Sequence, residues 1–146
     1  MSLAVQRNQL QRFVKLQARS VMKRNVLSVQ ARLTLRELDH LFSVYDFNSF
    51  PVVEDHHVIG IVTKFDFLKA FIFTPSSVVP HYDELMKRTV GEIMTRDVLT
   101  VHPTTPLTRV LQMVVDQKSR SFPVVDAKNR LQGIISRGDV ISALSG

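Results

Sequence analysis

Two short motifs combine a hydroxyl side chain with a carboxylate three residues later, Thr63-x-x-Asp66 and Ser136-x-x-Asp139. This spacing is typical of a helix N-terminus, where the hydroxyl caps the backbone and the acid interacts favourably with the helix dipole. Each cap contributes about 1 kcal/mol. The same carboxylate can also accept charge-assisted hydrogen bonds from a ligand, each contributing about 1.5 to 3 kcal/mol. The motifs therefore predict two helix starts and two candidate acceptor groups.

The sequence Asp55-His56-His57 is another candidate, because aspartate and histidine are frequent metal ligands. Its counterpart later in the chain, Ala127-Lys128-Asn129, has no ligand side chain, and no second acidic cluster accompanies it. We therefore interpret these residues as a turn without a metal. The chain has no cysteine, which excludes disulfides, thiol nucleophiles and thiolate metal sites. No serine, histidine and aspartate follow a recognisable catalytic order, so we do not expect an enzyme.

Both hydroxyl–carboxylate motifs belong to an internal repeat. The stretch from Phe50 to Asp66 returns, with substitutions, from Phe122 to Asp139. Corresponding residues are 72 apart before the repeated turn and 73 apart after it, as in the pairs Met22/Met94, Phe50/Phe122, Gly60/Gly133 and Asp66/Asp139. The extra residue falls in the turn Asp126–Arg130, where insertions are tolerated.

One repeat predicts the order strand, helix, strand, strand, helix. Val26–Val29 is a short β-rich run, and Thr34-Leu-Arg-Glu37 is a capping box that opens a helix. Phe50–Val53 and Val58–Val62 are close enough in sequence to form a hairpin, and the last helix follows from Thr63. A strand that leads through a helix to another strand predicts a right-handed crossover with a parallel pair, to which the hairpin adds an antiparallel neighbour.

The chain before the first repeat predicts an amphipathic helix. Its apolar residues recur on one face at helical spacing, at Leu3, Leu10, Phe13, Val14 and Ala18. We expect this face to pack on the domain that follows; a helix lying on a membrane surface is the alternative. Two prolines and two serines in Thr74–Pro80 mark a break. We therefore divide the chain into an N-terminal helix (1–18), a first repeat (19–73), a linker (74–89) and a second repeat (90–146).

The composition, 45% hydrophobic and 22% charged residues in 146, is that of a globular domain. The formal net charge of +6 favours an anionic ligand or partner. Lysine and arginine are spread along the chain and do not cluster with aromatic residues, so no pattern supports nucleic-acid binding. No apolar run has the 18 or more residues of a membrane span, and the N-terminus lacks the apolar core of a signal peptide. We expect a soluble, cytoplasmic protein without a membrane partner.

Between Arg19 and Leu144 the chain resembles a tandem pair of CBS (cystathionine β-synthase) domains, the Bateman module. The resemblance is carried by the order Val/Ile-Met, strand, helix, Phe-Pro-Val-Val-acid and Gly-x-x-Thr/Ser-x-x-Asp, which occurs twice in register. It implies an α/β (α+β) fold of two β-α-β-β-α repeats packed by pseudo-two-fold symmetry and preceded by a helix. It also implies pairing of the module into disc-shaped homodimers.

The function that this resemblance implies is regulatory. Such modules bind adenosine-containing ligands, AMP, ADP, ATP or S-adenosylmethionine, in the clefts between their repeats, and pass a conformational change to an effector protein. We therefore expect a nucleotide or metabolite sensor without catalysis. The competing hypothesis is a scaffold that dimerises and whose clefts bind nothing.

The resemblance further implies that each cleft takes its aspartate from one repeat and its base-binding wall from the other. The first site would contain Ile61, Thr63, Asp66, Asp97, Val98, Leu99, Ser119, Arg120 and Ser121. The second would contain Asn25, Val26, Leu27, Phe47, Asn48, Ser49, Ile134, Ser136 and Asp139. The aspartates would accept the two hydroxyl groups of a ribose, and the aliphatic residues would cover the apolar faces of adenine.

Phosphate binding should distinguish the two sites. The position that is often basic in the family is Arg120 in the first site and Asn48 in the second. We therefore expect a phosphorylated nucleotide beside Asp66 and Arg120. The Asp139 site would take an uncharged adenosyl group or remain empty.

Overall fold

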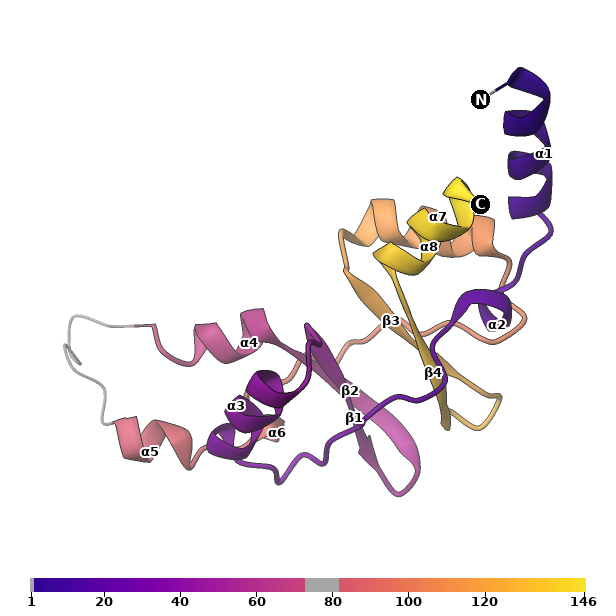
Figure 1. Ribbon diagram of the computed structural model, residues 1–146. Helices are drawn as coiled ribbons and strands as arrows, with labels where there is room; N and C mark the ends of the chain where they lie inside the picture. Colours follow the sequence, from indigo (N-terminus) through magenta and orange to yellow (C-terminus); the bar gives the residue numbers. More distant parts are fainter. Residues whose placement is uncertain (1, 73–81) are drawn as a thin grey trace. The chain divides into compact units, whose positions relative to one another are not determined.

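The computed structural model of the protein describes residues 2–72 and 82–146, which form a mixed α and β fold (Figure 1). The chain divides into two compact units. Unit 1 comprises Met1–Val26 and Leu99–Gly146, and unit 2 comprises Leu27–Val98. The units do not coincide with the sequence repeats, because each contains the hairpin of one repeat and the opening segment of the other. The predicted break Thr74–Pro80 lies outside the described residues.

The elements of unit 2 are α3 (Leu35–Val44), β1 (Ser49–Glu54), β2 (His57–Thr63), α4 (Lys64–Lys69), α5 (Tyr82–Met86) and α6 (Val90–Ile93). The predicted capping box of α3 is confirmed, because the Thr34 hydroxyl accepts the Glu37 N–H and the Glu37 carboxylate accepts the Thr34 N–H. Behind it, Leu35 and Leu38 pack with Phe50 and other fully buried apolar residues of β1 and β2. Tyr82–Met86, which the sequence places in the linker, forms a helix in this unit.

The elements of unit 1 are α1 (Leu3–Phe13), α2 (Ala18–Val21), α7 (Leu107–Gln117), β3 (Ser121–Val125), β4 (Leu131–Ser136) and α8 (Arg137–Ser145). Figure 1 shows α7 and α8 on the same side of the β3–β4 hairpin. The core of this unit combines Leu107 and Val110 of α7 with Phe122 and Ile135 of the hairpin, all of them buried.

Both predicted hairpins are confirmed as antiparallel pairs, β1 with β2 and β3 with β4. Asp55 and His56 form the turn of the first hairpin with positive φ angles of 48° and 66°, the backbone of a type I′ turn. Among the described residues no group of three or more potential metal ligands occurs. The longer second turn closes on Asp126, whose carboxylate accepts the N–H groups of Lys128 and Arg130. The bond from Arg130 is the main reason that the pKa of Asp126 is lowered.

The predicted parallel strand of each repeat is reduced to a single bridge, Val29 with Val52 and Val101 with Val124. Val29 donates to the Pro51 carbonyl and accepts the Val53 N–H. The next bond of a parallel ladder would need an N–H at residue 51, which proline lacks. Pro123 has the same effect on Val101 and its neighbours. The prediction of a four-residue strand is therefore wrong, and the residues that precede each bridge are outside any ladder.

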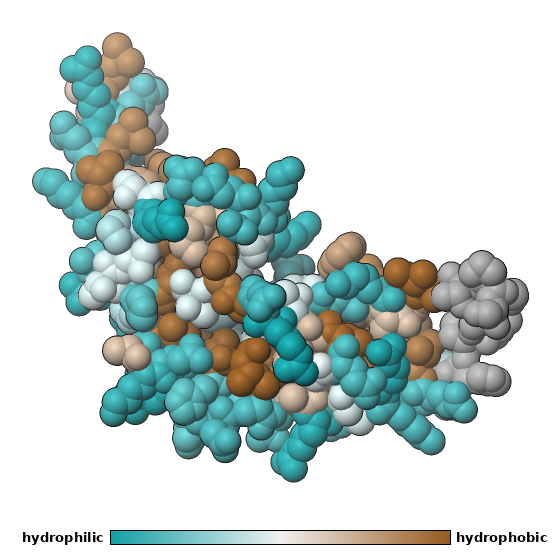
Figure 2. All heavy atoms as spheres, turned by 180° about the vertical axis from the view of Figure 1, so that it is seen from behind, coloured by the Kyte–Doolittle hydropathy of each residue, from teal (hydrophilic) through white to brown (hydrophobic). Residues whose placement is uncertain are grey.

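The apolar face predicted for residues 3–18 packs on the domain only in part, through Phe13 and Ala18. Helix α1 ends at Phe13. Lys15 N–H then donates to the Arg12 carbonyl and Leu16 N–H to the Phe13 carbonyl, and these turn bonds redirect the chain before Ala18. Phe13 and Ala18 are buried, whereas the other three predicted residues, Leu3, Leu10 and Val14, are more than half exposed. The upper left of Figure 2 shows this helix with apolar atoms at its surface. In the described part of the chain, no helix is long and apolar enough to cross a membrane.

The helices α2 and α6 are missing from the sequence-based prediction, and each leads into a segment that docks on a hairpin. Lys23 exchanges two backbone hydrogen bonds of 2.9 Å with Ile134 of β4, and Thr95 makes the equivalent pair with Ile61 of β2. The repeated glycines permit this close approach. A Cβ at Gly133 would lie 2.5 Å from the Lys23 carbonyl oxygen, and one at Gly60 would lie 2.8 Å from that of Thr95.

Gly133→Ala should therefore destabilise unit 1, since the new methyl group must displace backbone and not only a flexible side chain. We expect a loss of about 1 to 3 kcal/mol in the free energy of unfolding, measured by urea denaturation. Gly138→Ala is the matched control, because a Cβ there meets only the Ser136 hydroxyl at 3.6 Å in the first turn of α8. It should stabilise the helix by about 0.5 to 1 kcal/mol. Equal effects of the two substitutions would contradict this explanation.

Candidate ligand-binding site

In unit 2 the candidate site is built on the N-terminus of α4. The predicted capping box is present: the Thr63 hydroxyl accepts the Asp66 N–H at 3.0 Å, and Asp66 Oδ2 accepts the Thr63 N–H at 3.0 Å. The Thr95 hydroxyl lies 3.3 Å from both carboxylate oxygens, and the Lys69 ammonium lies 3.2 Å from Oδ1. Asp66 is only 3% exposed. Its charge is therefore compensated by a lysine one turn further along the helix and by a hydroxyl of the docked segment.

In unit 1 the equivalent site is built on the N-terminus of α8. Asp139 Oδ2 accepts the Ser136 N–H at 2.8 Å and the Ser136 hydroxyl at 2.9 Å, and the hydroxyl accepts the Asp139 N–H at 3.2 Å. The Lys23 ammonium lies 3.3 Å from Oδ1. The cap therefore occupies one carboxylate oxygen, and the other faces a lysine from the opening segment of the first repeat.

The segments predicted as adenine walls follow directly after these contacts. Val26 N–H donates to the Arg24 carbonyl and Val98 N–H to the Arg96 carbonyl, so that the chain bends at Asn25 and at the corresponding Asp97. One residue beyond Val26 and Val98 the chain passes from one unit into the other. Val26 and Val98 are half-buried.

Each unit thus gathers part of one predicted site. Ile61, Thr63, Asp66, Asp97 and Val98 lie together in unit 2, and Asn25, Val26, Ile134, Ser136 and Asp139 lie together in unit 1. Of the remaining residues, Leu99 and Ser119–Ser121 belong to unit 1, and Leu27 and Phe47–Ser49 belong to unit 2.

Within its own unit, each of the segments 47–49 and 119–121 borders a capping box. The Asn48 carbonyl accepts the Lys64 N–H, and Ser49 is paired with Thr63. The Arg120 carbonyl accepts the Arg137 N–H in the same way. The sequence-based assignment gave each segment to the aspartate of the other repeat, and the contacts observed here are those within each repeat.

Three residues that contact the aspartates are absent from the sequence-based assignment: Lys23, Thr95 and Lys69. The Asp66–Lys69 spacing of three residues is visible in the sequence as a helical ion pair. The contacts made by Lys23 and Thr95 join segments that are far apart in sequence. No local pattern could have identified them.

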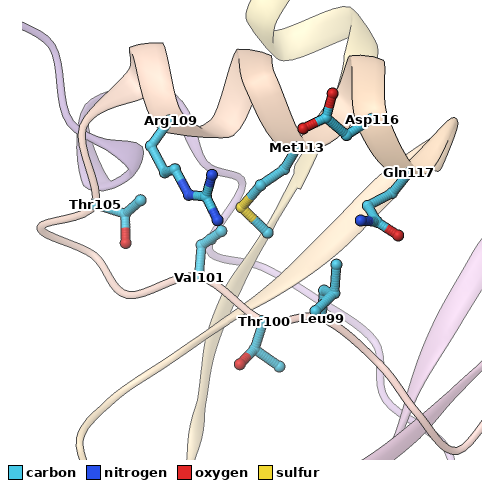
Figure 3. A pocket seen from close by; sticks show the side chains of 8 residues that line it. All are labelled: Leu99, Thr100, Val101, Thr105, Arg109, Met113, Asp116 and Gln117. Atoms are coloured by element: carbon cyan, nitrogen blue, oxygen red, sulfur yellow. The ribbon is translucent and has the colours of Figure 1, made fainter.

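A separate pocket of about 300 Å³ lies in unit 1 between α7 and the segment 99–105 (Figure 3). The eight residues that line it are Leu99, Thr100, Val101, Thr105, Arg109, Met113, Asp116 and Gln117. Only Leu99 among them belongs to the predicted sites. A smaller set of residues on α3, including Glu37 and Leu41, lines a hollow of about 340 Å³ at the corresponding place in unit 2. Each hollow lies beside the helix that is repeated, α7 or α3, and neither is lined by Asp66 or Asp139.

Comparison with known proteins identifies the repeat. The family model of the CBS domain matches residues 18–72 and 90–146. A chloroplastic CBS domain-containing protein of Arabidopsis thaliana, CBSX1, is 29% identical over 141 residues, which cover 83% of this chain and 60% of that protein. The protein MJ1232 of Methanocaldococcus jannaschii is 27% identical over 123 residues, covering 84% of this chain and 38% of that protein. The chain thus spans less than two thirds of the length of these relatives.

Solved structures give the same result. The structure is similar to that of CBSX2 of Arabidopsis thaliana in complex with AMP, with a TM-score of 0.75 and 25% identity over 87% of this chain and 94% of that chain. It is also similar to the CBS domain pair of protein MJ0100 in complex with 5′-methylthioadenosine and S-adenosyl-L-methionine. That comparison gives a TM-score of 0.73 and 26% identity over 90% of this chain and 100% of that chain.

Ser136→Ala should lower the free energy of unfolding by about 1 kcal/mol, because the Asp139 N–H loses its hydroxyl acceptor and Oδ2 loses a donor. Thermal unfolding should shift down by about 2 to 4 °C. Ser43→Ala is the control: the Ser43 hydroxyl donates only to the His40 carbonyl within α3, and its removal should leave the transition nearly unchanged. A wild-type transition for Ser136→Ala would show that the cap does not stabilise α8.

Proposed function

The chain belongs to the CBS domain family, and from this premise we propose that it is a regulatory module that binds an adenosine-containing ligand between its repeats. The candidate ligands are AMP, ADP, ATP and S-adenosylmethionine. Two similar structures, at 25% and 26% identity, are complexes with AMP and with 5′-methylthioadenosine and S-adenosyl-L-methionine. These complexes support the choice of an adenosyl ligand, and the residues of this chain support its mode of binding.

The main support for the proposal is that the two oxygens of each repeated carboxylate have different partners. In Asp66 and in Asp139 one oxygen, Oδ2, receives the backbone N–H of the capping box. The other oxygen, Oδ1, has lysine as an ionic partner, at 3.2 Å from Lys69 and at 3.3 Å from Lys23. A carboxylate offers about four acceptor positions, so the cap leaves positions on each aspartate for the hydroxyl groups of a ribose.

The adjoining segments are suited to the base. Val26 and Val98 are half-buried aliphatic residues, and Leu99 is 45% exposed. Pro51 and Pro123 prevent the parallel ladders from extending toward Val26, Val98 and Leu99. The backbone groups of these three residues therefore do not pair in a sheet. An adenine ring needs aliphatic contact on its faces and polar backbone groups at its edge. In our proposal these segments supply both.

Regulation follows if the ligand prefers one arrangement of the chain. A ligand that binds two arrangements equally shifts nothing, so its contacts must differ between them. Asn25 and Asp97 lie at bends in the two stretches of chain that lead from one unit into the other, and a ligand would act on these stretches. We propose that this change is passed to an effector protein, and that the module acts as a homodimer.

Calorimetric titration of the chain with AMP, ADP, ATP and S-adenosylmethionine tests this function. At least one of these ligands should bind. Asp66→Ala and Asp139→Ala should each remove one binding event or lower the affinity at that site at least about 10-fold, because one charge-assisted hydrogen bond is lost. The double variant should bind none of them. Binding to the double variant at wild-type strength would refute the role of the aspartates.

Glu37→Ala provides the matched control. Glu37 occupies the same third helical position in the capping box of α3, which belongs to neither site. Its loss should lower stability by an amount similar to that of the other two caps, about 1 kcal/mol, with ligand affinity unchanged. If the wild-type chain binds none of the four ligands, the alternative of a dimerising scaffold is favoured instead.

A further inference from the structure

Lys23 and Thr95 occupy the same position in the two repeats, 72 residues apart. Each contacts the aspartate of its own unit, Lys23 with an ammonium group 3.3 Å from Asp139 Oδ1 and Thr95 with a hydroxyl 3.3 Å from Asp66. At this position, therefore, the docked segments of the two sites differ by a full positive charge.

The lysine lies among residues assigned to the ligand. Its backbone is paired with Ile134, and Asn25 follows two residues later. Its side chain is 68% exposed, whereas that of Asp139 is 12% exposed. The ammonium group is thus held at the edge of the carboxylate by a flexible side chain that solvent surrounds, and it is free to take another anion.

Two other basic positions do not distinguish the sites, because Arg24 corresponds to Arg96 and Arg137 to Lys64. Lys69 does pair with Asp66, and the corresponding residue in α8 is Ser142. Lys69, however, lies on the second turn of α4, and its ammonium group is 5.4 Å from the centre of the Phe65 ring. The Phe65 side chain is itself 69% exposed. Lys69 thus reaches the buried Asp66 from the exposed surface of its own helix, not from a docked segment.

A ribose that binds Asp139 must share or replace the ammonium group at Oδ1. A ligand without an anion would leave Lys23 without its partner, whereas a phosphate on the same ribose offers it a new one within reach of its four-carbon chain. At Asp66 the docked segment supplies only the neutral Thr95, and the lysine at Oδ1, Lys69, comes from α4 itself and lies over the Phe65 ring. We propose that Lys23 makes the Asp139 site selective for adenosyl ligands that carry a 5′-phosphate.

This inference rests on the proposed function, since it assumes that the aspartates bind ribose, and it reverses the preference expected from Arg120 and Asn48. In a chain with Asp66→Ala, only the Asp139 site retains its carboxylate. Calorimetric titration of that chain should give tighter binding of AMP than of adenosine. Adding Lys23→Thr should lower the ratio of the two affinities at least about 10-fold, the value of one charge-assisted bond. The reciprocal chain, Asp139→Ala with Thr95→Lys, should gain preference for AMP.

Lys128→Thr on the Asp66→Ala background is the control, because it removes the same charge from an exposed turn of the same unit. It should leave the affinity ratio within about twofold, as expected for a distant surface charge. If Lys23→Thr also leaves the ratio unchanged while both probes still bind, Lys23 has only a structural role; the selectivity is then refuted and the proposed function remains. If the Asp66→Ala chain binds neither AMP nor adenosine, the ribose assignment of Asp139 and the selectivity are both wrong.

Discussion

The antiparallel docking of each repeat's opening segment on a hairpin strand is the interaction on which the candidate sites depend. Lys23 pairs with Ile134, and Thr95 pairs with Ile61. In both places a glycine on the strand, Gly133 or Gly60, leaves space for the backbone of the docking segment. This contact places one polar side chain of the segment against the aspartate that caps the next helix. Without the docking, each aspartate would be the acid of an ordinary helix cap.

The proline of each Phe-Pro-Val-Val sequence limits the parallel pairing at the other end of the same segments. Val29 and Val101 each form a single parallel bridge, and Pro51 and Pro123 cannot donate the bond that would extend it. The segment between the docking contact and the bridge is therefore anchored at both ends, and a local bond from Val26 N–H to the Arg24 carbonyl, or from Val98 N–H to the Arg96 carbonyl, fixes its bend. Such an anchored segment suits the proposed ligand site, because little conformational entropy remains to be lost when a ligand arrives.

Elements defined by local patterns were predictable from the sequence. The hairpins follow from alternating apolar runs around turns, and the helix starts follow from the hydroxyl–acid spacing at Thr34, Thr63 and Ser136. The failures have long-range causes. The strand predicted at Val26–Val29 does not form because Pro51, 22 residues after Val29, has no N–H to donate. The apolar stripe from Leu3 to Ala18 is interrupted by a turn that contains neither glycine nor proline, so the sequence does not predict it. The residue pair Lys23 and Asp139 could not be predicted, since segment exchange between the repeats brings it together.

The two interpretations of the Thr/Ser-x-x-Asp motif, helix cap or ligand acceptor, are compatible because a carboxylate has two oxygens. The cap takes Oδ2 in both repeats, and its geometry is almost the same at Asp66 and Asp139. Differences between the sites must therefore come from residues outside the cap. Among these residues are the docked segments, where the repeats have diverged, with lysine beside Asp139 and threonine beside Asp66. Both repeats thus have the same acceptor, and the ligand preference that we propose for each site depends on the docked segment beside it.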